Sequence, residues 1–107
     1  MHEVTKESIK AFLNHRNGKF GGVSQYDGLQ NTTVKDDVFY LHDNAIMKLV
    51  NDELFVRVHT NSVITRRRIN GLSCFGYNVS LVQRKFKPIL NGETVTDLYK
   101  WYKINKK

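Results

Sequence analysis

Residues 38–58 read VFYLHDNAIMKLVNDELFVRV, and this stretch decides the fold of the chain. Three apolar runs, at 38–41, 45–50 and 54–58, are separated by short breaks that contain Asn and Asp. Both residues tolerate the positive φ that tight hairpins require. The third run alternates at every second position, which predicts one buried and one partly solvated face. The stretch therefore predicts an antiparallel three-strand meander.

The segments on either side of the meander predict helices. Thr5 is a candidate N-cap for a helix over about 6–16, which Asn17-Gly18 would end. Polar residues at 60–62 can cap a second, basic helix over about 63–72. A short strand is possible at 23–26.

The last third of the chain predicts a hairpin followed by one more element. The alternating run 79–87 favours a strand, which Pro88 breaks or marks as an edge. Asn91-Gly92 is a strong hairpin signal and would fold Ile89-Leu90 back against Thr94-Val95. The aromatic tail 96–104 suits a strand or a short helix, and a short helix is favoured.

The expected fold class is α+β: an N-terminal helix, an antiparallel three-strand meander, a second basic helix, and a C-terminal hairpin with a short helix. The 107 residues fit one domain spanning 1–107. The N-terminus lacks an apolar leader, and no run approaches the roughly 18 apolar residues of a membrane span. A single cysteine, Cys74, excludes an internal disulfide, so we expect a cytoplasmic protein that does not insert into a membrane.

Positive charge is concentrated in the second part of the chain. The net charge is +7, with ten Lys/Arg against two Asp/Glu in residues 66–107 and seven against eight in residues 1–65. Clustered basic residues are the electrostatic footprint of nucleic-acid binding, and also suit an acidic protein partner. The candidate contact residues for nucleic acid or an acidic partner are Arg66, Arg67, Arg68, Arg84, Lys85, Lys87, Lys100 and Lys103.

The arginine run and two aromatics need separate interpretation. Arg66, Arg67 and Arg68 span an arc of about 200° on a helix, so at least one must lie beside the core with its stem packed. Phe86 and Trp101 lie among the basic residues and could stack on bases, but a core position is favoured for both.

No motif in the sequence carries recognisable catalytic machinery, and we expect neither a metal nor a cofactor. The glycines at 18–22 lack the spacing of a phosphate loop. Cys74 is expected to be a small core residue. His42-Asp43 is the only tempting histidine–carboxylate neighbour, and a small ribonuclease using His42 or His59 is kept as an alternative.

Residues 39–92 resemble small bacteriophage-encoded proteins. Residues 40–48 (YLHDNAIMK) resemble the Leu-His-Gly-Asn-x-Ile-Ala-Lys hairpin of that family, with Asp43 in place of Gly and Met47 in place of Ala. Residues 60–72 are similar to its Thr-Asn-x-Thr-Lys-x-Arg-Leu-Asn-x-Leu helix, with Ile69 in place of Leu. The family is functionally uncharacterised, so the resemblance implies a phage origin, a host-cell cytoplasmic location and a meander–helix–hairpin fold, without active-site residues.

These observations favour a non-catalytic phage accessory protein that contacts nucleic acid through its C-terminal basic surface. The alternative is a host-takeover or anti-defence inhibitor. It would dock the same arginines on an acidic surface of a host polymerase, nuclease or defence complex.

Overall fold

The computed structural model describes residues 3–21, 31–60 and 62–107. Its helices are α1 (Glu3–Leu13), α2 (Val63–Gly71) and the short 3-10 helix η1 (Leu72–Phe75). Its strands are β1 (Gly18–Phe20), β2 (Thr32–Lys35), β3 (Val38–Leu41), β4 (Asn44–Val50), β5 (Glu53–Val56), β6 (Leu81–Arg84), β7 (Lys87–Leu90), β8 (Glu93–Thr94) and β9 (Tyr102–Ile104).

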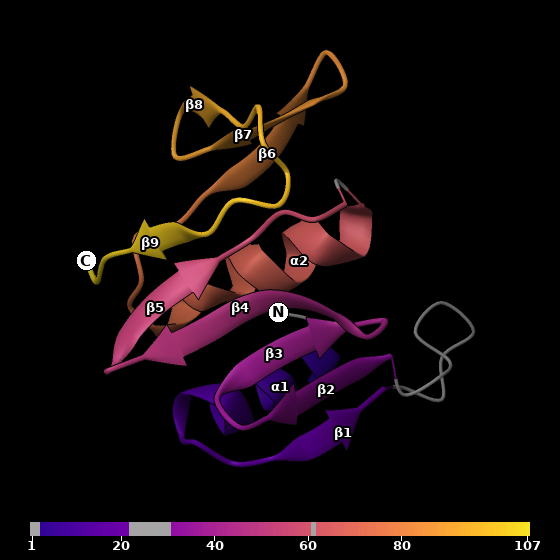
Figure 1. The fold of residues 1–107 in the computed structure, drawn as a ribbon, viewed down its shortest axis with the longest axis vertical. Helices are drawn as coiled ribbons and strands as arrows, with labels where there is room; N and C mark the ends of the chain where they lie inside the picture. The colour runs from indigo at the N-terminus through magenta and orange to yellow at the C-terminus, as the bar shows by residue number, and fades with distance from the viewer. Residues whose placement is uncertain (1–2, 22–30, 61) are drawn as a thin grey trace.

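The strands form two antiparallel sheets. The larger has six strands in the order β1-β2-β3-β4-β5-β9, and the smaller has three in the order β6-β7-β8. Helices α1 and α2 lie together on one face of the large sheet, whereas none of the described helices covers its other face (Figure 1). The small sheet lies beyond β9 at one end of the molecule, and its β6–β7 turn points away from the rest of the fold (Figure 1).

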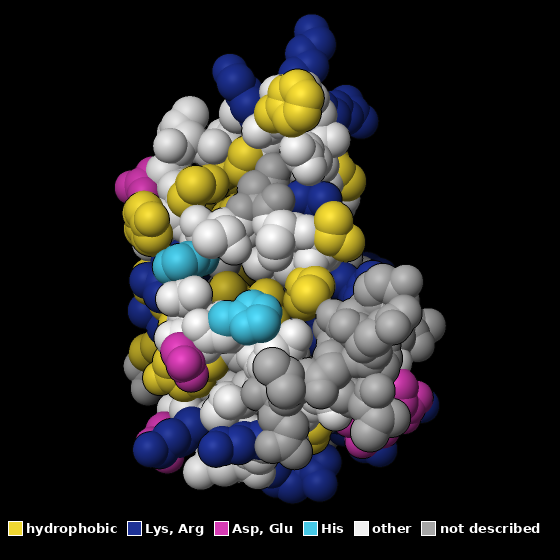
Figure 2. Space-filling view, turned by 90° about the vertical axis from the view of Figure 1, so that its right-hand side faces the viewer, with side chains coloured by type: hydrophobic (Ala, Val, Ile, Leu, Met, Phe, Trp, Pro, Cys, Tyr) yellow, Lys and Arg dark blue, Asp and Glu magenta, His cyan; other side chains and the backbone are white. Residues whose placement is uncertain are grey.

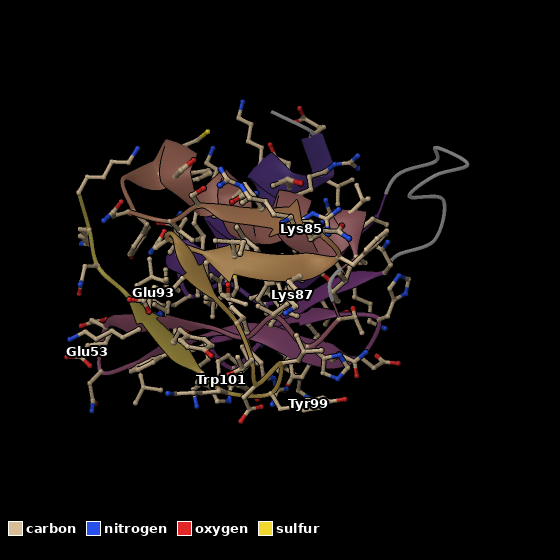
Figure 3. All side chains as sticks on the ribbon, turned by 90° about the horizontal axis from the view of Figure 1, so that it is seen from above. Glu53, Lys85, Lys87, Glu93, Tyr99 and Trp101 are labelled. Carbon is tan, nitrogen blue, oxygen red and sulfur yellow. The ribbon has the colours of Figure 1, made fainter. Side chains whose placement is uncertain are left out.

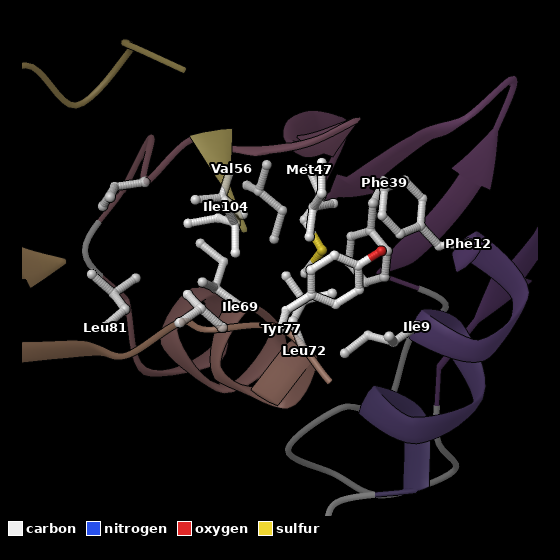
Figure 4. Packing of buried hydrophobic residues seen from close by; sticks show 14 of the residues in the cluster. Ile9, Phe12, Phe39, Met47, Val56, Ile69, Leu72, Tyr77, Leu81 and Ile104 are labelled. Carbon is white, nitrogen blue, oxygen red and sulfur yellow. The ribbon is translucent and has the colours of Figure 1, made fainter. Parts of the chain in front are cut away.

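The core lies between the helices and the large sheet. Figure 4 shows Ile9 and Phe12 of α1 facing Phe39 and Met47 of the sheet, and all four are fully buried. The rings of Phe12 and Phe39 meet edge to face with centroids 5.8 Å apart, a favourable arrangement for aromatic pairs. In β3 and β5 buried and half-buried or exposed residues alternate, as the period of two predicts.

A buried charge joins three elements within this core. The Arg68 side chain on α2 is fully buried. Its Nη1 donates to Thr5 Oγ1 of α1 at 2.6 Å, and its Nε donates to Thr32 Oγ1 of β2 at 3.3 Å. Thr5 was predicted to cap α1, but it lies inside the helix, because its hydroxyl faces inward to this guanidinium.

Asn70 attaches the small sheet to the rest of the fold. Its Nδ2 donates to Leu81 O at 2.7 Å, and its Oδ1 accepts from Leu81 N at 2.6 Å. Both backbone groups at the start of β6 are thus held by one side chain at the end of α2. Since the position of β6 sets that of β7, this contact fixes where the β6–β7 hairpin stands.

The α+β class is confirmed, and the predicted meander matches β3, β4 and β5. The tail forms β9 instead of the short helix we favoured, because Tyr102–Ile104 pairs with the edge of β5 and buries Ile104. The possible strand at 23–26 lies outside the described residues. Among the described helices none is both long and apolar enough to span a bilayer.

We expect Thr5→Val to lower the free energy of unfolding by about 1.5–3 kcal/mol, because the buried guanidinium loses one acceptor while the side-chain shape is kept. Urea denaturation would measure this. Thr33→Val is the matched control, since Thr33 lies half-buried on β2 and its change should stay within about 0.5 kcal/mol. Equal effects of the two substitutions would contradict the role given to Thr5.

Candidate nucleic-acid interface

The hairpin tip, residues 84–87, joins β6 to β7 through a two-residue turn. Arg84 and Lys87 are paired across the strands, and Lys85 and Phe86 between them have φ of 50° and 64°. Positive φ at both central residues is the geometry of a type I′ hairpin turn, whose twist matches that of the strands. The tip is therefore a compact turn that presents four successive side chains at the end of a two-stranded ribbon.

All four side chains of the hairpin tip are exposed. Phe86 has 92% of its surface open to solvent, although its sequence context favoured a core position. Seen from the side of the molecule toward which this turn points, cationic side chains stand around a hydrophobic one at the top (Figure 2). The interleaving of basic and aromatic residues expected here is thus present at the surface.

In the part of the chain that the structure describes, no acidic side chain balances the charges of the hairpin tip. Within the described ranges no ion pair involves Arg84, Lys85 or Lys87. Arg84 and Lys87 are direct cross-strand neighbours, and like charges in that position destabilise a hairpin. An anion bound at the tip would relieve this repulsion.

The other five predicted contact residues lie elsewhere. Arg68 is in the core, so its guanidinium is not presented at the surface. Arg66 and Arg67 are half-buried on α2. Near β9, Lys103 Nζ is 3.3 Å from Glu53 Oε1, and Lys100 Nζ lies 5.4 Å from the centre of the Tyr102 ring.

The sequence did not reveal a second group of cations and aromatics on the large sheet. Lys48 Nζ lies 4.3 Å and Arg57 Cζ 4.6 Å from the ring centre of the half-buried Trp101. Figure 3 shows Trp101 on the face of the large sheet away from the helices. Lys85 and Lys87 lie apart from it, on the small sheet. Arg57 Nε also donates to Ala45 O at 3.0 Å, so these cations are already engaged within the chain. The hairpin tip is the stronger candidate for an anionic partner.

Among the described residues, no hydrogen bond or ion pair joins the residues considered for ribonuclease chemistry to one another. His42 is exposed in the β3–β4 turn, with φ of 50°. His59 is half-buried, with its ring edge-on to Tyr99 at 5.2 Å. Cys74, expected in the core, is exposed. The described residues include no group of three or more His, Cys, Asp or Glu placed to hold a metal ion.

A histidine–carboxylate pair occurs instead where α1 ends. His15 Nδ1 lies 2.7 Å from Asp37 Oδ1, and His15 Nε2 lies 3.9 Å from Asp52 Oδ1. The hydrogen bond with Asp37, followed by the charge of that carboxylate, raises the pKa of His15 above its usual 6.5. His15 and Asp52, but not Asp37, line a cavity of about 460 Å³, together with Leu13, Leu49, Phe75, Tyr77 and Lys106.

Comparison of the chain with models of protein families, with curated proteins and with solved structures finds no match.

We expect Asp37→Asn to lower the pKa of His15 and to reduce stability only where His15 is protonated. The pKa of His15 is higher in the folded state than its unfolded value of 6.5. The contribution of the pair to the free energy of unfolding is therefore fully present below pH 6.5 and is lost as the pH rises through the folded-state pKa. NMR titration of the imidazole and denaturation at about pH 6 and about pH 9 would measure both effects.

Asp43→Asn is the control for this change, because Asp43 has the same φ of 65° as Asp37 in a comparable turn. It should leave the pKa of His15 and the pH dependence of stability unchanged. A pKa of His15 that stays raised in Asp37→Asn would contradict the assignment.

Proposed function

We propose that this protein binds nucleic acid through the hairpin tip. The observation that carries the proposal is the set of three exposed cations, Arg84, Lys85 and Lys87, around an exposed aromatic ring, with no ion pair to them among the described residues. Arginine and lysine bind phosphate oxygens through charge-assisted hydrogen bonds, and arginine can do so with two parallel bonds.

The shape of the hairpin supports a phosphate backbone as the partner. β8 pairs only with Ile89 and Leu90, so the end of the β6–β7 hairpin has two strands and is narrow. Such an end can approach a nucleic-acid strand or groove without contact by the rest of the fold (Figure 1). The excess of cations over residues 66–107 adds a longer-range attraction for a polyanion.

The biological setting rests on the resemblance of residues 39–92 to small bacteriophage proteins. Such a protein would act in the cytoplasm of the infected cell as a non-catalytic accessory factor.

The competing proposal is an inhibitor docked on an acidic host protein. It would use the same hairpin tip, because an exposed Phe among cations also suits an interface anchor. Capture of a single partner from nuclease-treated lysate, together with no affinity for nucleic acid, would select that alternative.

Replacing Arg84, Lys85 and Lys87 by Gln should weaken nucleic-acid binding at low salt and flatten its salt dependence. Each lost phosphate contact on a single strand changes the slope of log K against log salt by about 0.7, so the loss of three is about 2. Fluorescence anisotropy with labelled oligonucleotides at several salt concentrations gives this slope.

The matched control removes the same charge from another surface. Lys6, Lys10 and Lys35 are exposed on α1 and β2, and their replacement by Gln should change the slope much less. An equal loss in both triple variants would indicate attraction by net charge alone. Absence of binding by the unmodified protein at about 50 mM salt would exclude the proposed function.

A further inference from the structure

The turn at the hairpin tip departs from the chemistry of the other tight turns. Among the described residues, five turns have two successive residues at positive φ: 36–37, 42–43, 51–52, 85–86 and 91–92. Four of them place Asn, Asp, His or Gly there, which tolerate the left-handed region. Lys85-Phe86 has none of these, and a bulky aromatic at positive φ is a genuine outlier.

Three features that oppose local stability coincide at this turn. Phe86 is in the left-handed region, the residue is 92% exposed, and the flanking Arg84 and Lys87 repel across the strands. The neighbouring turn, Asn91-Gly92 at φ of 49° and 85°, shows that the same small sheet also uses the favourable residues. Local strain of this kind is typical of functional sites, where binding of a partner offsets the loss of folding stability.

We propose that Phe86 stacks on an unpaired base of single-stranded DNA or RNA while the surrounding cations bind the adjacent phosphates. This inference rests on the proposed function and names the ligand class of the same site. The ring is apolar and exposed among the cations, and the face of a base is the surface of a nucleic acid on which such a ring stacks.

A single strand fits this tip better than a duplex does. To insert between paired bases the ring would have to unstack a base step, which costs about as much free energy as one stacking contact returns. Proteins that do so recover the cost over a large wrapped surface. The hairpin tip has only three cations and one ring, which is too small a surface to recover that cost. An unpaired base requires no unstacking, so the ring can stack on it directly.

Phe86→Gly tests the inference without threatening the fold, because glycine adopts positive φ freely and should relax the turn. Binding would be measured at several salt concentrations with single-stranded oligothymidylate, oligouridylate, a duplex of equal length and an abasic strand, and affinities would be compared at the same salt concentration. We expect Phe86→Gly to weaken binding of both base-bearing single strands by about 5- to 100-fold. The salt slope should stay unchanged, and the duplex and abasic strand should bind equally well to both proteins.

Phe86→Tyr should retain the affinity for single strands, since tyrosine offers a similar ring. The inference is overturned if Phe86→Gly binds single strands as tightly as the unmodified protein, or if it loses affinity for the duplex or the abasic strand to the same extent. The triple Gln variant could show a reduced salt slope while Phe86→Gly binds single strands as tightly as the unmodified protein. That combination would support the proposed function and exclude only the stacking role of Phe86.

Discussion

The arrangement of the fold depends on the burial of one guanidinium. A charged side chain in an apolar core is very costly unless hydrogen bonds satisfy it, so the residues around Arg68 cannot be placed arbitrarily. Thr5 and Thr32 supply hydroxyl oxygens from α1 and β2, which fixes both elements relative to α2. Because α2 also carries Asn70, which holds the start of β6, the orientation of the small sheet depends on the same helix.

The elements that could be predicted are those whose signals are local. Alternating apolar residues and breaks containing Asn and Asp are enough to predict β3, β4 and β5, and Asn91-Gly92 is enough to predict the turn between β7 and β8. The pairing of β9 with β5 has no local signal. The aromatic residues of this short segment suit a helix or a strand. It forms a strand because β5, fifty residues earlier, offers an unpaired edge.

The candidate site was predictable in composition but not in geometry. The helical arc of three successive arginines implied that at least one lies beside the core, yet which one is buried depends on hydroxyls 63 and 36 residues away. The run 79–87 alternates like one continuous strand, so the sequence contains no signal for the turn at Lys85-Phe86 and favours a core position for Phe86. What separates Phe86 from a core residue is backbone geometry, because a reversal of the chain there turns its ring to solvent.

The order of the strands has a consequence for the chain as it is synthesised. One edge of β5 pairs with β4, which directly precedes it in the chain. The other edge pairs with Tyr102–Ile104, which is synthesised much later. During translation β5 therefore keeps a row of open N–H and C=O groups until Tyr102–Ile104 has left the ribosome and paired with it. An open strand edge can anneal to another chain, so the nascent protein is most vulnerable to aggregation in this interval.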